Sequence, residues 1–196
     1  MDILAYLLGS KGGGGDEDQG EKYYLYGAND DTLTLPVTVK NTLKITFDLD
    51  INMDKSMPGN TSTILSYGGQ TTWLYTKVFA TIGMYRGNWT YCAVYPGKYI
   101  KHIVLDRVNR ILSAVGTESD VSVDDSGNNW QTSDNNYVLH LGQWVGYQSI
   151  QIEDNGVLAY DLIATVDTDG TPCLKDTLSG QYYYSANGTA VLKTLA

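Results

Sequence analysis

Apolar and polar residues alternate along residues 44–53, and this alternation is the clearest structural signal in the chain. Every second residue of the segment is apolar, and most of the residues between them are Thr, Asp or Asn. Successive side chains of a strand point to opposite faces of a sheet, so a period of two predicts a strand with one buried and one solvated face. The polar face carries Asp48, Asp50, Asn52 and, beyond the segment, Asp54; we interpret it as a solvated face that resists aggregation.

Short runs of the same kind recur along the rest of the chain and are separated by turns rich in Gly and Asn. We expect a hairpin that turns at residues 106–109, and a long polar loop over residues 117–136. Many short strands without a long helix predict an all-β fold, an antiparallel β-sandwich or jelly roll. The other expected strands are residues 23–26, 33–39, 64–67, 72–78, 81–85, 90–95, 99–105, 110–115 and 137–141.

The strongest turn signal lies in residues 149–163, where Asn155 and Gly156 separate two alternating runs. A tight two-residue hairpin turn of this type needs positive φ at both central positions, which Asn and Gly tolerate best. The sequence therefore predicts a β-hairpin closed at Asn155 and Gly156.

The closing part of the chain, about a quarter of its length, resembles a known family pattern. After the hairpin come an Asp-Thr-Asp-Gly turn at residues 167–170, the segment 174–183 and an Ala-Asn-Gly-Thr string at residues 186–189. This ordered string resembles the closing strands of concanavalin A-like (laminin-G-like) jelly-roll domains in structural proteins of phages and prophages of Firmicutes. The resemblance implies a tail-fibre, baseplate or capsid-surface protein that is made in the host cytoplasm and acts in the virion.

The first ten residues form a separate apolar segment. Ile3, Leu4, Leu7 and Leu8 fall on one helical face. A helix this short is not stable alone in water, so the segment either packs on a partner or remains a loosely ordered terminus. We expect residues 1–10 to be an anchor peptide that binds other virion proteins.

Residues 11–20 are rich in Gly and acidic residues and are expected to be a flexible linker. Residues 21–196 then form the jelly-roll domain. The resemblance also implies a homo-oligomer, since phage structural proteins of this kind assemble in several copies.

Composition narrows the choice of partners. The 196 residues carry 22 acidic against 13 basic side chains, for a net charge of −9 and a pI near 4.5. Nucleic-acid binding needs clustered Lys and Arg, so no nucleic-acid partner is expected. No apolar run approaches the eighteen or more residues that a membrane span needs, so no span is expected. The 16 Tyr and 21 Gly suit pleated strands and tight turns.

The residues that usually hold metals are sparse. Cys92 and Cys173 are the only cysteines, and His102 and His140 the only histidines. A disulfide is possible, although two distant thiols are more often small buried hydrophobic groups. No Cys-x-x-Cys pair or EF-hand-like loop is present, so we expect neither a metal nor a cofactor.

Catalysis is not expected. Related glucanases use Glu-x-Asp-x-x-Glu on one strand, and paired carboxylates at a set separation are what glycoside hydrolysis requires. The string at residues 118–123 lacks the final Glu, and the adjacent acids Glu153 and Asp154 point to opposite sheet faces. His102 and His140 lie in expected strands without a Gly-x-Ser-x-Gly motif, so a Ser-His-Asp enzyme is not indicated.

Aromatic side chains are the remaining candidates for recognition, since an exposed Trp or Tyr can bind a sugar ring or a protein. We expect Trp73 and Trp144 to belong to the core. Trp130, in the polar loop, is expected to be exposed and functional, and Trp89 is the next candidate. The candidate glycan- or protein-binding residues are Trp130, Trp89, Tyr91, Asn128 and Asn129.

These observations favour a phage virion structural or adhesion protein whose jelly-roll head contacts host-surface glycans or other virion subunits. A free bacterial carbohydrate-binding module, a lectin, is the alternative. A glycoside hydrolase with a dispersed carboxylate pair is a weaker one.

Overall fold

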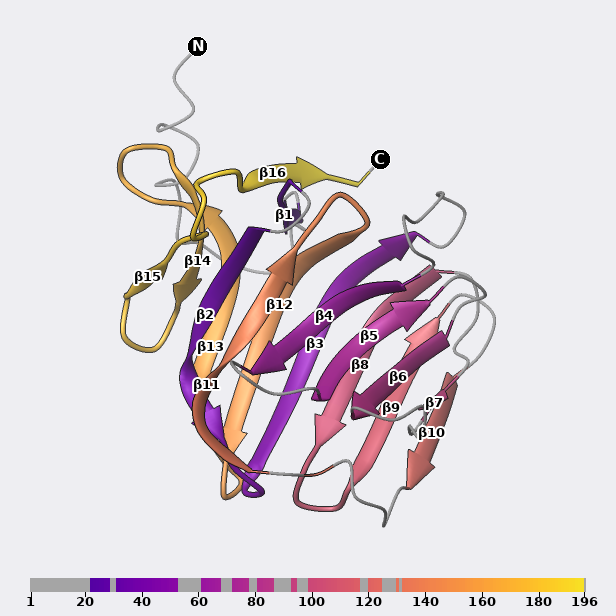
Figure 1. Ribbon diagram of the computed structural model, residues 1–196. Helices are drawn as coiled ribbons and strands as arrows, with labels where there is room; N and C mark the ends of the chain where they lie inside the picture. The colour runs from indigo at the N-terminus through magenta and orange to yellow at the C-terminus, as the bar shows by residue number, and fades with distance from the viewer. Residues whose placement is uncertain are drawn as a thin grey trace, which may run out of the picture.

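The computed structural model describes residues 22–28, 31–52, 61–67, 72–77, 81–86, 93–94, 99–116, 120–124, 130 and 132–195. Within this part of the chain all regular structure is β-strand, and every strand pairing is antiparallel. Two sheets lie one over the other as in a sandwich (Figure 1). The expectation of an all-β antiparallel sandwich is confirmed.

The larger sheet has ten strands among the described residues. Its main path runs β10-β9-β8-β3-β12-β13-β14-β15, and β1 pairs with both β12 and β16. The strands are β1 (Tyr23–Tyr26), β3 (Leu43–Asn52), β8 (Tyr99–Asp106), β9 (Ile111–Gly116), β10 (Asp120–Asp124), β12 (Val145–Asp154), β13 (Val157–Val166), β14 (Pro172–Asp176), β15 (Tyr182–Tyr183) and β16 (Val191–Thr194).

The smaller sheet has six strands among the described residues, in the order β2-β11-β4-β5-β6-β7. Neighbouring strands here, too, come partly from distant parts of the sequence, because β11 lies between β2 and β4. The strands are β2 (Asp31–Val39), β4 (Thr61–Tyr67), β5 (Thr72–Lys77), β6 (Thr81–Arg86), β7 (Ala93–Val94) and β11 (Ser133–Leu141).

The core lies between the sheets and follows the predicted alternation. In β3 the alternate apolar side chains from Ile45 to Ile51 are at most 2% exposed, as predicted; Met53 and Asp54 lie outside the described residues. Tyr147 of β12 is fully buried, and its hydroxyl donates to the carbonyls of Ile64 at 3.1 Å and His140 at 2.8 Å. This side chain therefore joins the two sheets by hydrogen bonds across the core.

Both predicted hairpins are present. Asn155 and Gly156 have φ of 53° and 76°, so the turn between β12 and β13 has the positive φ at both central positions that its sequence requires. The hairpin between β8 and β9 turns at residues 107–110, one residue later than predicted, with Arg110 at a φ of 57°.

The expectation of a continuous polar loop over residues 117–136 is wrong. Backbone pairing with β9 makes residues 120–124 a strand, β10, and β11 begins at Ser133 rather than at Tyr137. The pairing of β11 with β2 has two register irregularities near Asn136. Because of them, the start of β11 shows no regular alternation of apolar and polar residues.

Several expectations fall on the rest of the chain. Of the expected strand at residues 90–95, the structure describes only β7. The anchor peptide, residues 1–10, and the linker, residues 11–20, lie outside the described residues, so both stay predictions.

The strand β1 belongs to the larger sheet, where it pairs with the start of β12 and with β16, next to which it lies in Figure 1. The Tyr26 ring covers Gly146 so closely that a Cβ atom at position 146 would lie 2.2 Å from Cζ of Tyr26. The Tyr26 hydroxyl donates to Asp50 at 2.7 Å, and the ammonium of Lys193 lies 4.7 Å from the ring centroid. Glycine at position 146 therefore permits this contact.

We expect Gly146→Ala to lower the free energy of unfolding by about 1–3 kcal/mol, the usual cost of forcing extra atoms into a packed site. The added methyl group would displace Tyr26 and break its hydrogen bond to Asp50. Chemical denaturation measures the change. Gly142→Ala, where an added Cβ meets no atom within 4 Å, is the control. Equal stability of the two variants would contradict the close contact.

Candidate functional site

Trp130 does not form the exposed binding platform expected from the sequence. Its side chain is only 5% exposed and belongs to the hydrophobic core. The guanidinium carbon of Arg107 lies 5.9 Å from the ring centroid, within the range of a cation–π contact. This expectation is wrong because a distant turn supplies a cation that covers the ring. Of the other four candidates, Trp89, Tyr91, Asn128 and Asn129, the structure describes none.

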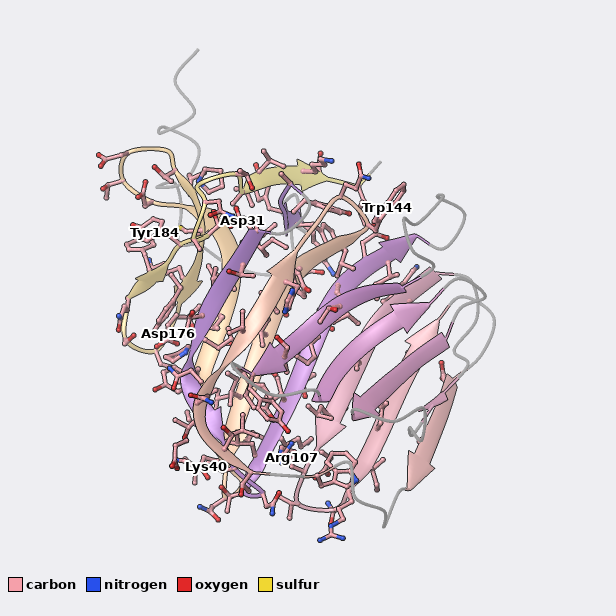
Figure 2. The ribbon with its side chains drawn as sticks, viewed as in Figure 1. Asp31, Lys40, Arg107, Trp144, Asp176 and Tyr184 are labelled. Atoms are coloured by element: carbon pink, nitrogen blue, oxygen red, sulfur yellow. The ribbon has the colours of Figure 1, made fainter. Side chains whose placement is uncertain are left out.

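Arg107 is a buried cation at one end of the sandwich, with 2% of its surface exposed (Figure 2). Its Nε donates to the carbonyl of Lys40 at 2.8 Å, and its terminal nitrogens donate to Asn41 Oδ1 and to the Tyr137 hydroxyl, each at 3.1 Å. Burial raises the pKa of Tyr137 to about 12, although the positive charge of Arg107 opposes the shift. These contacts join three chain segments and give Arg107 a structural role.

The C-terminal residues that resemble the family pattern, within residues 167–189, also stabilise the fold. Asp176 is 1% exposed and accepts hydrogen bonds from the Asp161 amide at 3.0 Å, the Ser179 amide at 3.2 Å and the Ser179 hydroxyl. Burial disfavours the carboxylate, but these hydrogen bonds outweigh it and hold the pKa of Asp176 below its ordinary value. The motif residues Asp176 and Ser179 therefore close the turn after β14.

The Asp-Gly turn before β14 is organised in the same way. Asp167 Oδ1 accepts from the amides of Asp169 and Thr171, each at 2.9 Å, and Oδ2 accepts from the Tyr184 hydroxyl at 2.8 Å. The hydrogen bond from the Thr171 amide, followed by that from Tyr184, lowers the pKa of Asp167. The bond to Asp167 raises the pKa of Tyr184 to about 12. The carboxylate is thus engaged in turn formation.

Asp31, at the start of β2, binds the last part of the motif (Figure 2). It is 1% exposed and accepts from the amides of Thr32 at 2.8 Å, Asn187 at 2.9 Å and Thr189 at 3.0 Å, and from the Thr189 hydroxyl. Burial opposes ionisation, but the hydrogen bonds, led by that of the Thr189 hydroxyl, lower the pKa of Asp31 to about 2. A buried carboxylate thus fixes residues 187–189 to a strand more than 150 positions earlier.

The polar face of β3 carries the most distinctive side-chain cluster. Asp48 Oδ1 accepts from Nδ1 of His102 on β8 at 2.7 Å, and Oδ2 accepts from the hydroxyl of Ser149 on β12 at 2.8 Å. Next to it, Asp50 Oδ2 accepts from the Tyr26 hydroxyl. Burial, followed by the negative charges of Asp50 and Asp48, raises the pKa of Tyr24, which lies beside both carboxylates. We call Tyr24, Asp48, Asp50, His102 and Ser149 the outer-face cluster.

Sequence reasoning identified the polar face of β3 but not the outer-face cluster. Asp48 lies opposite His102 in the pairing of β3 with β8 and opposite Ser149 in the pairing of β3 with β12. These strands are far apart in the sequence, so no spacing of residues along one segment predicts the cluster. The one available signal was that His102 falls in an expected strand, where a histidine occupies a sheet face.

The Ser-His arrangement in the outer-face cluster does not form a triad like that of the serine hydrolases. In the outer-face cluster the carboxylate lies in the middle, so the Ser149 hydroxyl donates to Asp48 and not to the His102 base that nucleophilic catalysis requires. Ser66 Oγ lies 2.7 Å from Nε2 of His140 on the smaller sheet. That pair has the contact that a nucleophile makes with a base.

The structure tests the cysteine prediction at Cys173. Cys173 is a free, fully buried thiol whose Sγ lies 3.7 Å from the Thr165 carbonyl, and burial raises its pKa to about 11. This agrees with the interpretation of Cys173 as a small hydrophobic group; Cys92 lies outside the described residues.

Within the described ranges no three His, Cys, Asp or Glu side chains form a metal-binding group. Trp144 packs against the core, as predicted, and the side chain of Trp73 is outside the description.

In the part of the chain that the structure describes, no helix has the length and apolar character that a membrane crossing needs. Comparison with protein-family models and with curated proteins gives no significant match to this chain.

Proposed function

We propose that the chain is a structural and adhesion protein of a phage or prophage particle. Its β-sandwich head is held to the particle by residues 1–10 through the linker, residues 11–20, and is displayed in several copies. The head contacts host-surface glycans or other virion subunits.

The observation that carries the proposal is the structural use of the motif that resembles phage jelly rolls. Its Asp176 and Ser179 close a turn, and its Asn187 and Thr189 donate to the buried Asp31. The resemblance therefore concerns residues that build a rigid scaffold, which is what a displayed binding head requires. In the outer-face cluster the Ser149 hydroxyl donates to Asp48 and not to His102, which favours binding over nucleophilic catalysis at this cluster.

A free carbohydrate-binding module is the second candidate. The outer-face cluster favours it, because half-exposed carboxylate, imidazole and hydroxyl groups on one sheet face are suited to sugar hydroxyls. The two candidates differ in whether the protein belongs to a particle.

Deleting residues 1–15 is expected to reduce incorporation into particles to background while the head stays folded. The physical reason is that the four large aliphatic residues of the anchor peptide supply apolar area that only a partner can bury. Incorporation is measured by quantitative mass spectrometry of purified particles, and folding by the melting temperature of the isolated variant.

The control replaces the linker acids and leaves the anchor intact, as Asp16→Ser, Glu17→Ser and Asp18→Ser together. This triple variant is expected to enter particles at the normal level because the linker needs length and not charge. Normal incorporation of the deletion variant would overturn the anchor role.

A further inference from the structure

We propose that the outer-face cluster, Tyr24, Asp48, Asp50, His102 and Ser149, is a binding site for a neutral, hydroxyl-rich saccharide. The inference rests on the proposed adhesion function and assigns it a surface and a ligand class.

The position of the cluster gives it an extended binding surface. His102, Asp48 and Ser149 lie opposite one another on three adjacent strands, β8, β3 and β12, whose backbones are about 5 Å apart, so the three side chains share one face. The Asp48 side chain is 47% exposed and that of His102 is 34% exposed. The polar groups are thus fixed by the sheet and still open to a ligand.

The unused hydrogen-bonding capacity of the cluster matches hydroxyl groups. Nδ1 of His102 donates to Asp48, which leaves Nε2 as an acceptor in the neutral ring. Each carboxylate can accept about four hydrogen bonds and uses fewer within the protein. The Tyr24 hydroxyl, which has no hydrogen-bond partner in the described part of the chain, can donate or accept. A polyol offers both donors and acceptors at several spaced positions.

One end of the cluster is closed by a preformed wall. The Tyr26 ring lies against Gly146 and binds Asp50 through its hydroxyl, while Lys193 lies over the ring. Asp50 is therefore held in one orientation before a ligand arrives, which lowers the entropic cost of binding. Tyr24, on the same strand, extends the wall with an aromatic group that suits the apolar face of a sugar.

The negative charge of the outer-face cluster determines which class of saccharide it favours. Asp48 and Asp50 carry negative charge, and an ion pair on the same face, Lys44 with Glu153 at 3.6 Å, adds no net charge. Anionic sugars would be repelled by the two carboxylates. Lys193 already places a cation beside the Tyr26 ring, whose hydroxyl binds Asp50, so a ligand amine is not needed there. These contacts favour neutral sugars.

The test is an array of neutral, amino-bearing and acidic oligosaccharides probed with the full chain, followed by titration of the strongest binder. We expect binding to neutral members of the array. Tyr24→Phe, which removes one hydroxyl, should weaken affinity roughly three- to tenfold. Asp48→Asn and His102→Gln, which alter the centre of the cluster, should weaken it by roughly tenfold or more.

Glu153→Gln is the matched control, because it lies on the same face of β12, four residues from Ser149. It should bind as the wild-type chain does, and all variants should keep their melting temperature within a few degrees. The inference is overturned if no neutral saccharide binds, if acidic or amino sugars bind better, or if the three cluster variants bind as well as Glu153→Gln. Particle incorporation is independent of this result, so loss of the saccharide site leaves the proposed particle role to its own test.

Discussion

Replacing Arg107 with methionine is expected to lower the free energy of unfolding by about 3 kcal/mol, the largest effect of a single substitution that we predict. Methionine keeps much of the length of the side chain but removes the donors to Lys40, Asn41 and Tyr137. Hydrogen bonds from a charged group contribute about 1.5–3 kcal/mol each, and an acceptor left unsatisfied in the interior adds a penalty. Denaturant unfolding followed by fluorescence and circular dichroism measures the loss.

Lys101→Met on the neighbouring strand β8 is the control, since Lys101 is exposed and its replacement should change stability by less than about 0.5 kcal/mol. A double-mutant cycle of Arg107→Met with Tyr137→Phe should show a coupling of about 1 kcal/mol, because the two side chains share a buried hydrogen bond. A change at Arg107 as small as that at Lys101 would show that this end of the sandwich is not held by the guanidinium.

Asp31→Asn is expected to cost about 2 kcal/mol at neutral pH and to change how stability depends on pH. The pKa of Asp31 falls from an ordinary 3.8 to about 2 in the folded protein, and each unit of such a shift corresponds to about 1.4 kcal/mol. Because the folded-state pKa is the lower one, this stabilisation is complete above about pH 4 and is lost as the pH falls through about 2. Unfolding free energies measured from pH 7 to pH 2 follow the loss.

The difference between the wild-type chain and Asp31→Asn isolates this carboxylate from other carboxyl groups with lowered pKa values, such as Asp176. That difference should be constant down to about pH 4 and shrink towards zero near pH 2. Asp169→Asn, at an exposed turn position, should leave the curve unchanged. A difference between the Asp31 variant and the wild type that did not depend on pH would contradict the hydrogen-bonded carboxylate.

The features predicted correctly from the sequence are those that depend on neighbouring residues. The strand β3 follows from an alternation that one buried face imposes, and the β12–β13 hairpin follows from the φ values that Asn155 and Gly156 accept. In both cases local preference and tertiary structure agree.

The features that sequence reasoning missed depend on distant contacts. Trp130 lies among polar residues, but Arg107 covers it from another turn, so its burial has no local signal. Strand β10 exists because β9 supplies a pairing edge. From the sequence, Asp48 is interpreted as a solvated acid. In the structure, the registers of β8 and β12 bring His102 and Ser149 next to it. Pairing order in a sandwich is non-local, and spacing along one strand does not encode it.

We propose that this sandwich is a displayed component of a phage or prophage particle. The most direct test of this proposal is the copy number of the full chain in particles purified from cells that produce it, measured by quantitative mass spectrometry against a major structural protein of the particle. We expect a fixed stoichiometry of several copies per particle that persists through density-gradient purification. Recovery of the chain only in the particle-free fraction would contradict it.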